Sequence, residues 1–245
     1  MNLSVLQKTR LYPKPKLYSK PFPFIIIEDA LPEKIYQELE ETFPEVLVMD
    51  DAFISEPNTY RYKGNSVFLD NGDRKTIPNL WLEFFEYHTS REFLEHSLNV
   101  FGLELEHHQK VTIRNVDNSG HYVTDCQFVV HEPLPETETT RTAHLDNPIE
   151  VYAGLLYMKK KNDMSTGGDF VIHETQEPVT TKDVRVVTSK TKPLHKVPYK
   201  PNTFCMFLNV NNSVHGVTPR VNASETRRSI NIIGEYSPNS SHRMW

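Results

Sequence analysis

The pattern of hydrophobic and polar positions divides the chain into a helical first part and a strand-rich second part. Residues 29–43 carry apolar side chains at i, i+4 spacing, and residues 78–101 carry two apolar stripes, so we expect one helix and then two more. A β-branched run at 24–27 predicts a strand. From about residue 109, Gly, Pro and Asn/Asp turns separate short runs that we predict as strands at 110–116, 121–130, 150–158, 168–173, 183–189, 203–209 and 227–233.

Many short strands after a few helices are typical of a β-sandwich or barrel covered by helices. At 245 residues and 28.5 kDa the chain is long enough for one such domain, and we expect a single domain over 1–245. In this prediction residues 1–108 contribute a strand and helices that pack on the core, 109–237 form the β core, and 238–245 are a frayed tail. The proline-rich residues 1–22 are interpreted as an extended lead-in.

Two segments lack periodicity, and we predict that both are loops. Residues 51–77 hold Pro57, Gly64 and Gly72 among many polar side chains. Residues 132–140 are acidic and contain prolines. The second segment is either a solubilising hairpin tip or a gate for substrate, and together the two segments could form a mobile cover.

Several conspicuous residues are assigned to structural roles. The aromatic stripe of Trp81, Phe84 and Phe85 has the spacing of core packing. Cys126 and Cys205 are too few for a disulfide framework and have the apolar neighbours of buried thiols. His107, His108 and His121 lie outside any metal-like pairing, and we interpret them as surface or hydrogen-bonded side chains.

Charge and hydropathy narrow the class of protein. The net charge of −5, with both signs dispersed, argues against a protein built to grip nucleic acid or an acidic membrane. We find no signal-peptide core near the N-terminus and no apolar run of the length that crosses a membrane. With the sparse cysteines, this predicts a cytoplasmic protein.

Candidate chemistry begins at His144 and Asp146. On an extended strand residues i and i+2 share a face, so this imidazole and this carboxylate would converge while Leu145 points the other way. Far downstream, His215 could supply a third ligand. Two histidines and one carboxylate on one face suit non-haem Fe(II) with its oxygen chemistry.

A second group of candidate residues lies in the predicted strand at 227–233. Alternation places Arg227, Ser229 and Asn231 on one face. A guanidinium inside a small β-barrel is costly unless it meets an anion, and a carboxylate is its natural bidentate partner. A surface strand with two solvated arginines is the alternative. Arg228 follows directly, and we favour Arg227 as the inward residue because Ser229 shares its face.

These residues resemble the prolyl 4-hydroxylase-like branch of the 2-oxoglutarate and Fe(II)-dependent oxygenases over roughly residues 22–237. Two features depart from that family: the interval from His215 to Arg227 is long, and the last strand ends Ile232-Ile-Gly-Glu-Tyr236 without the Trp often found there. The motifs that carry the resemblance are Phe22-Pro23-Phe24, Leu31-Pro32-Glu33, His144-Leu-Asp-Asn-Pro148, Leu156-Tyr157-Met158, Thr166-Gly-Gly-Asp-Phe170, His215-Gly-Val-Thr-Pro219 and Arg227-Arg-Ser229.

The resemblance implies a mainly β, double-stranded β-helix fold, a distorted cupin-like jelly roll with supporting N-terminal helices. It implies Fe(II) as the metal, 2-oxoglutarate and O2 as cosubstrates, and it allows ascorbate as a reductant. The implied metal ligands are His144, Asp146 and His215, and the implied 2-oxoglutarate-binding residues are Arg227, Ser229 and Tyr157.

The implied reaction is hydroxylation of a C–H bond, coupled to decarboxylation of 2-oxoglutarate to succinate and CO2. A prolyl residue of a peptide or protein, or free proline, is the first candidate substrate. Another amino acid or small molecule is an alternative. A non-catalytic cupin-like module that binds a metal or ligand, and an interaction sandwich without metal, are alternatives of a different class.

Overall fold

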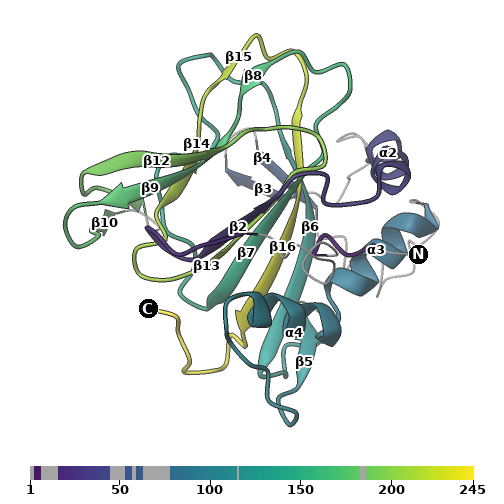
Figure 1. Ribbon diagram of the computed structural model, residues 1–245, viewed down its shortest axis with the longest axis vertical. Helices are drawn as coiled ribbons and strands as arrows, with labels where there is room; N and C mark the ends of the chain where they lie inside the picture. Colours follow the sequence, from purple (N-terminus) through teal and green to yellow (C-terminus); the bar gives the residue numbers. More distant parts are fainter. Residues whose placement is uncertain are drawn as a thin grey trace.

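A helical layer, a large β-sheet and a smaller β-sheet lie one against the next (Figure 1). The computed structural model describes residues 3–6, 16–44, 53–56, 59–62, 78–114, 116–182 and 186–245. The large sheet separates two hydrophobic clusters. One lies between this sheet and the helices, and the other lies between the two sheets.

The large sheet has the strand order β1-β2-β13-β7-β16-β6-β4-β3, with β5 beside β6. Its pairs are antiparallel except β5 with β6. The strands are β1 (Leu17–Tyr18), β2 (Phe24–Ile27), β3 (Phe53–Glu56), β4 (Thr59–Tyr62), β5 (Val111–Ile113), β6 (Tyr122–His131), β7 (Glu150–Tyr157), β13 (Phe204–Leu208) and β16 (Arg227–Tyr236).

The smaller sheet has the order β12-β9-β14, and two short ribbons flank it. One ribbon pairs β8 with β15, and the other pairs β10 with β11. These strands are β8 (Thr166–Gly167), β9 (Phe170–Thr175), β10 (Thr181–Lys182), β11 (Val186–Val187), β12 (Thr191–Val197), β14 (His215–Val217) and β15 (Arg220–Val221).

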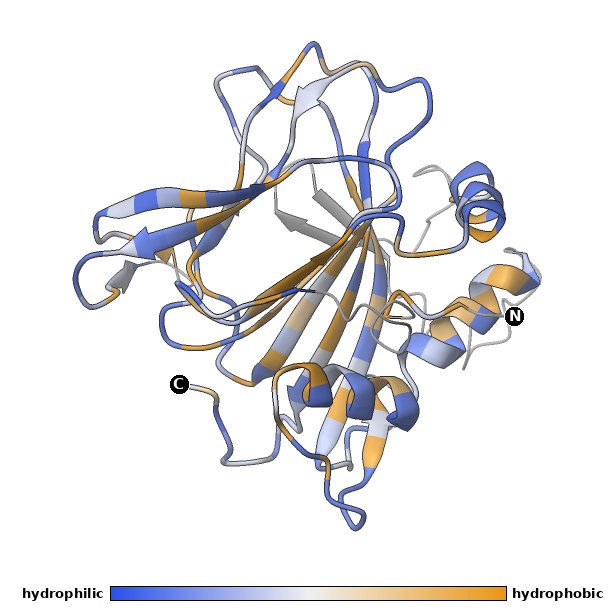
Figure 2. Cartoon of the chain, in the orientation of Figure 1, coloured by the Kyte–Doolittle hydropathy of each residue, from blue (hydrophilic) through white to orange (hydrophobic). Residues whose placement is uncertain are grey.

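In the part of the chain that the structure describes, three helices cover the outer face of the large sheet: α2 (Glu33–Glu41), α3 (Asn79–His88) and α4 (Arg91–Val100). Pro32 and Pro78 stand at the N-termini of α2 and α3, where a missing N–H costs nothing. Ser90 caps α4 because its hydroxyl accepts the N–H of Phe93. The hydrophobic bands of α3 and α4 are visible in Figure 2. All three predicted helices are present, and the assignment of Trp81, Phe84 and Phe85 to the core is confirmed.

Alternation along β16 gives this strand two different faces. Ile230 and Ile232 face the helices and are fully buried in that cluster. Asn231, between them, lines a cavity together with residues of the smaller sheet, as expected for a strand with covered faces on both sides. Helices on one side of the large sheet and the smaller sheet on the other confirm the predicted mainly β, double-stranded β-helix class.

Most predicted strands are present, but β12 and β14 were not predicted, and neither were the two-residue strands β1, β8, β10 and β15. In β12, Pro193 and three lysine or histidine side chains leave the strand polar and largely exposed, so no hydrophobic period marks it. A register shift between Pro193 and His195 accommodates the missing N–H. The β14 strand has three residues, too short to show a period.

The prediction of a structureless loop over 51–77 is wrong for two segments, since Phe53–Glu56 and Thr59–Tyr62 pair with each other and extend the large sheet beside β6. The rest of that span lies outside the described residues, as do residues 183–185 of the predicted strand at 183–189. The expected loop at 132–140 is irregular, as predicted. Both cysteines are free and buried, as predicted.

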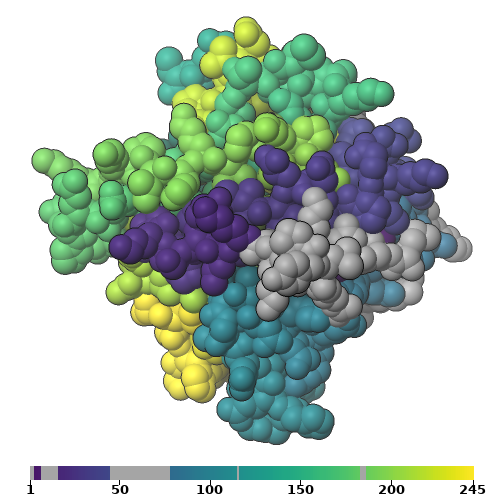
Figure 3. Space-filling view, in the orientation of Figure 1, coloured from purple at the N-terminus to yellow at the C-terminus, as the bar shows by residue number. Residues whose placement is uncertain are grey.

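The chain ends are held more firmly than the sequence suggested. The predicted frayed tail is wrong, because the N–H of Met244 donates to Pro148 O at 2.8 Å and Trp245 Nε1 donates to Asn209 Oδ1 at 3.4 Å. At the other end, residues 3–6 are buried, and the N–H of Val5 donates to His88 Nε2 at 3.3 Å. Figure 3 shows the segment from β1 to α2, in purple, crossing the face of the molecule between the smaller sheet and α4. None of the described helices has the length and apolar character needed to cross a bilayer.

Candidate metal centre and carboxylate pocket

Backbone pairing brings His144 and His215 together. The N–H of His144 donates to His215 O at 2.9 Å, and the N–H of His215 donates to His144 O at 3.1 Å. Residues that exchange both hydrogen bonds are direct cross-strand partners, so their side chains leave on the same side. The two imidazole rings lie 4.2 Å apart, centroid to centroid. His144 forms isolated bridges with His215 and Val186 rather than belonging to a regular strand, a departure from the extended strand we expected.

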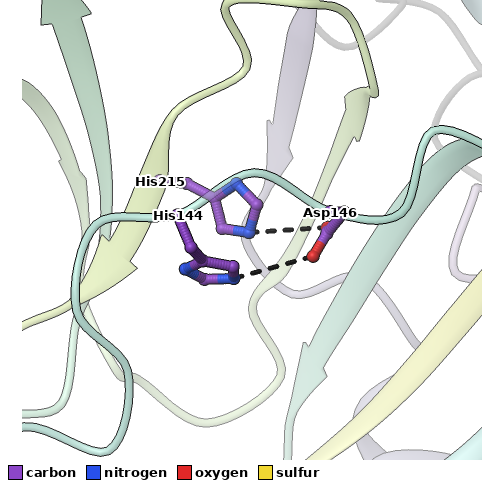
Figure 4. Close-up of side chains that lie close together, drawn as sticks. All are labelled: His144, Asp146 and His215. Atoms are coloured by element: carbon purple, nitrogen blue, oxygen red, sulfur yellow. Dashed lines mark ion pairs between the residues drawn. The ribbon is translucent and has the colours of Figure 1, made fainter. Parts of the chain in front are cut away.

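Asp146 completes the group because it lies two residues after His144. Its Oδ1 is 3.6 Å from His144 Nε2, and its Oδ2 is 3.5 Å from His215 Nε2. Figure 4 shows both rings turned toward the carboxylate. The three ligand atoms lie within 4.8 Å of one another. Ligand atoms held about 2.1 Å from one ion are about 3 Å apart when adjacent, so a small contraction would bring all three onto a metal. Leu145, between the two ligands, is buried and is not among the residues that line the cavity.

Hydrogen bonds orient both imidazoles for metal binding. His144 Nδ1 donates to Thr142 O at 2.8 Å, and His215 Nδ1 donates to Ser213 O at 2.8 Å. These bonds leave both Nε2 lone pairs facing Asp146, the arrangement that metal-bound histidines use. Burial, with the neighbouring His144, lowers the pKa of His215 to about 4, so the ring is neutral at pH 7. Burial alone would raise the Asp146 pKa, but the His215 and His144 rings hold it below its usual range.

Aromatic rings shield one side of this centre. Phe207 lies 4.5 Å and Phe170 lies 5.2 Å from the His215 ring, centroid to centroid. Both are fully or almost fully buried and line the same cavity as the three ligands. An apolar wall beside the ligands strengthens electrostatic interactions there and keeps water from that side.

Arg227 lies in the same cavity, although only 1% of its surface is exposed. Its Nε donates to Gly168 O at 2.9 Å, which fixes the guanidinium. Gly167 and Gly168 both adopt positive φ, and a Cβ at Gly167 would collide with Pro219 O, so the predicted tight Gly-Gly turn is required to present this carbonyl.

Two polar side-chain atoms of this cavity have no partner among the described residues. Arg227 Nη2 and Ser229 Oγ are both buried without a hydrogen bond. Burying a guanidinium N–H without an acceptor costs free energy, and native structures rarely contain a buried N–H without a hydrogen bond. The pair offers an N–H donor and a hydroxyl on one face, a donor set that fits a carboxylate.

Two tyrosines flank the Arg227 guanidinium. The rings of Tyr157 and Tyr199 each lie 5.1 Å from Arg227 Cζ. The Tyr157 hydroxyl accepts the N–H of Phe170 at 3.0 Å, so its proton is still available to a ligand. Tyr157 was predicted to contribute its hydroxyl; here it also packs against the guanidinium. Tyr199 was missed, since it follows a polar strand and no sequence motif marks it.

Arg228 occupies the opposite face of the sheet. Its Nε donates to Met158 O at 3.0 Å, its Nη2 pairs with Glu40 of α2, and its Cζ lies 4.7 Å from the Phe43 ring. The expectation that Arg227 is the inward arginine therefore agrees with the geometry. Asn231 lines the cavity two residues beyond Ser229, also as expected.

The loop at 132–140 reaches the edge of the cavity. Thr140 lines it with a hydroxyl that has no partner within the described part of the chain. The loop is tied down by the Thr139 hydroxyl, which donates to Val217 O, and by Glu136, whose carboxylate accepts the N–H of Asn222 at 2.8 Å. These bonds hold the loop beside the strand that carries His215.

Asn209 joins the two segments that carry the metal ligands, and sequence reasoning missed it. Its Nδ2 donates to Asn147 O at 2.7 Å and to Glu150 O at 2.9 Å. Its Oδ1 accepts the Ser213 hydroxyl at 3.0 Å. The Asp146 loop and the approach to His215 therefore share one buried amide.

This chain resembles solved structures but no known sequence family. No protein-family model matches this sequence, and no curated protein matches it. Solved structures do match. The epimerase SnoN, in complex with Fe3+, α-ketoglutarate and nogalamycin RO, has a TM-score of 0.54 at 8% identity, over 91% of this chain and 88% of its own.

A prolyl hydroxylase from Trichoplax adhaerens, in complex with a hypoxia inducible factor peptide fragment, has a TM-score of 0.50 at 10% identity, over 96% of this chain and 88% of its own. A prolyl 4-hydroxylase from Phytophthora capsici matches 88% of this chain at 16% identity with a TM-score of 0.49, and this chain spans 59% of its length. The chain thus has the double-stranded β-helix fold found in 2-oxoglutarate and Fe(II)-dependent oxygenases.

Proposed function

We propose that this protein is an Fe(II)- and 2-oxoglutarate-dependent dioxygenase that hydroxylates a C–H bond. In this reaction one oxygen atom of O2 enters the new hydroxyl group and the other enters succinate. The first carbon of 2-oxoglutarate leaves as CO2. A bound iron, with 2-oxoglutarate and O2, would supply the oxidising chemistry.

One observation carries the proposal. The unpartnered Arg227 Nη2 and Ser229 Oγ share a cavity with His144, Asp146 and His215. A metal site alone occurs in proteins of many functions, and so does a buried arginine alone. Both in one cavity fit a metal together with a dicarboxylate, and SnoN holds iron and α-ketoglutarate on the same fold.

Different residues of the protein would bind the metal and the cosubstrate. His144, Asp146 and His215 would hold the metal through two imidazoles and one carboxylate, leaving coordination positions open. Arg227 and Ser229 would fix the distant carboxylate of 2-oxoglutarate, with the Tyr157 hydroxyl assisting. Orientation of the cosubstrate in a site partly closed to water is the protein's contribution to catalysis.

A prolyl residue of a peptide or protein, or free proline, is the first substrate to test. Its support is the similarity of His144-Leu-Asp-Asn-Pro148 to the corresponding segment of peptide-modifying prolyl hydroxylases. The fold alone does not select a substrate, since SnoN carries nogalamycin RO and the Trichoplax enzyme a peptide. Another amino acid or small molecule is the alternative.

Succinate formation tests the proposal. Purified protein with Fe(II), ascorbate and 2-oxoglutarate should release succinate, and a substrate should raise that rate and gain 16 Da by mass spectrometry. Binding of 2-oxoglutarate to the Mn(II)-loaded protein, measured by calorimetry, separates the two halves of the proposal. Tight binding without any succinate would instead assign a non-catalytic ligand-binding module.

A further inference from the structure

A row of buried hydrogen-bond acceptors runs along the large sheet beyond the metal centre. Asp125 Oδ1, Gln127 Oε1 and Asn231 Oδ1 have no hydrogen-bond partner among the residues that the structure describes. Asp125 is fully buried and Gln127 is 2% exposed. Native proteins leave few such atoms unsatisfied, so three adjacent to one another need an explanation.

Strand register shows where these side chains point. Asn231 pairs with Gln127, and Ile233 pairs with Asp125, across β16 and β6. Directly paired residues project from the same face of a sheet. Asn231 and Ile233 line the cavity that holds the metal ligands, so Gln127 and Asp125 face the same side.

The orientation of the Gln127 amide is fixed. Its Nε2 donates to Asp125 Oδ2 at 2.6 Å, which directs Oε1 away from that carboxylate as a true acceptor. Arg114 Nη1 also bonds to Asp125 Oδ2, at 2.9 Å, so both protein donors use one oxygen and leave Oδ1 open.

The charge around these acceptors is negative. Glu235 and Glu150 are register partners on the same face, and Glu150 lines the cavity. With Asp125 they are three carboxylates, and Arg114 pairs with Asp125 and Glu235 and also interacts with Glu150. Burial raises the pKa of Glu235, and the neighbouring Arg114 opposes that shift.

This acidic end is distinct from the Arg227 end. Asn231 lies four residues along β16 from Arg227, about 14 Å at 3.4 Å per residue. Arg227 offers donors and positive charge, whereas the row at Asn231, Gln127 and Asp125 offers acceptors and negative charge. Two ends of opposite character require ligand groups of opposite character.

We propose that the prime substrate carries a positively charged N–H donor group, which binds to Gln127 Oε1, Asp125 Oδ1 and Asn231 Oδ1. This inference rests on the dioxygenase function proposed above and specifies its substrate. An amino acid with a free ammonium group, including free proline, satisfies it. A prolyl residue inside a peptide has neither the charge nor an N–H and does not.

The first test changes the ligand and leaves the protein intact. Calorimetry on the protein loaded with Mn(II) and 2-oxoglutarate would compare the twenty free amino acids and common polyamines with their N-acetylated forms. Acetylation removes the charge and one or more donors, so the charged ligand should bind at least tenfold more tightly than its neutral counterpart. If no charged amine binds more tightly than its neutral form, the proposal is wrong.

The second test changes the protein. Gln127→Met keeps the length of the side chain and removes Oε1, and we expect it to weaken binding of the charged ligand roughly 10- to 150-fold. Binding of 2-oxoglutarate should change less than threefold. Gln37→Met, the same change on the exposed face of α2, is the matched control. Thermal unfolding of both variants confirms that they fold, and equal ligand affinity in wild type and Gln127→Met contradicts the assignment.

The two proposals can fail separately. Charged amines that bind through Gln127 without stimulating succinate formation would support the subsite and contradict the dioxygenase. Neutral ligands that stimulate succinate formation as strongly as charged ones would support the dioxygenase and contradict the subsite.

Discussion

Arg227 and Arg228 are adjacent in β16, yet their guanidinium groups lie on opposite faces of the large sheet. Arg227 faces the cavity of the metal ligands and bonds to Gly168 O. Arg228 faces the helices and pairs with Glu40. Both are nearly fully buried, so burial alone does not distinguish a ligand-binding arginine from a structural one. The distinction lies in their partners, because Arg227, unlike Arg228, has a buried guanidinium nitrogen with no partner among the residues described.

Substituting each arginine should therefore give different results. Arg227→Ala removes a charge-assisted pair and should weaken 2-oxoglutarate binding by about 2–5 kcal/mol, roughly 30- to several-thousand-fold. Arg228→Ala should leave that affinity within threefold but lower the free energy of unfolding by roughly 1–3 kcal/mol, because Glu40 loses its partner while remaining partly solvated. Calorimetry and chemical denaturation measure the two effects. The opposite pattern would move the anion site by one residue.

Removing the carboxylate ligand should abolish the metal site and leave the fold intact. Asp146→Ala takes away one of three ligands, and we expect Mn(II) binding to fall at least a hundredfold and succinate formation to disappear. The preformed sheets hold the barrel, so the midpoint of thermal unfolding without metal should change little. Asp117→Ala, at an exposed carboxylate paired with Lys110, is the control. Retained turnover in Asp146→Ala would refute the ligand assignment.

Burial of His88 should make stability depend on pH. Its Nδ1 donates to Phe84 O at 2.7 Å while Nε2 accepts from Val5, so the neutral ring is fully satisfied, and burial lowers its pKa from 6.5 to about 3. Between these two values the unfolded chain binds the proton and the folded chain does not. The free energy of unfolding should therefore fall with decreasing pH, at up to about 1.4 kcal/mol per pH unit from this residue.

Denaturant unfolding of wild type and His88→Phe between pH 7 and pH 4 measures that contribution. The phenylalanine has no ionisable ring, so its stability curve should be flatter than the wild-type curve in this window. Parallel curves would show that His88 does not carry the dependence.

The shared amide of Asn209 predicts a link between stability and metal binding. Asn209→Leu leaves Asn147 O and Glu150 O without this donor, and we expect a loss of about 2–4 kcal/mol in unfolding free energy. Because the same amide positions the Asp146 loop, Mn(II) affinity should also fall several-fold. Asn239→Leu, at an exposed position, should change neither quantity. An Asn209 variant that loses stability but keeps full metal affinity would separate the two roles.

The sequence predicted the residues whose geometry is local. Asp146 follows His144 by two, and Arg227, Ser229 and Asn231 alternate along one strand, so short-range rules place them on common faces. The three helices were predicted because their apolar stripes are complete.

The remaining contacts come from distant pairings. The Gly168 carbonyl that fixes Arg227, the Tyr199 ring beside it and the amide of Asn209 each belong to a segment far away in sequence. Pattern reasoning at short range carries no information about such contacts. The prediction of a frayed tail failed for a similar reason. Met244 is held by a backbone hydrogen bond to Pro148, which no local sequence pattern signals.

The alternation of β16 has an evolutionary consequence. Odd-numbered positions from Arg227 to Ile233 face the cavity, while the even-numbered positions Ile230 and Ile232 pack against the helices. Mutations at odd positions can therefore change what the cavity accepts without disturbing the helical core, and mutations at even positions can repack that core without altering the ligands. A single strand of this kind lets substrate choice and thermal stability diverge independently among descendants of one ancestral gene.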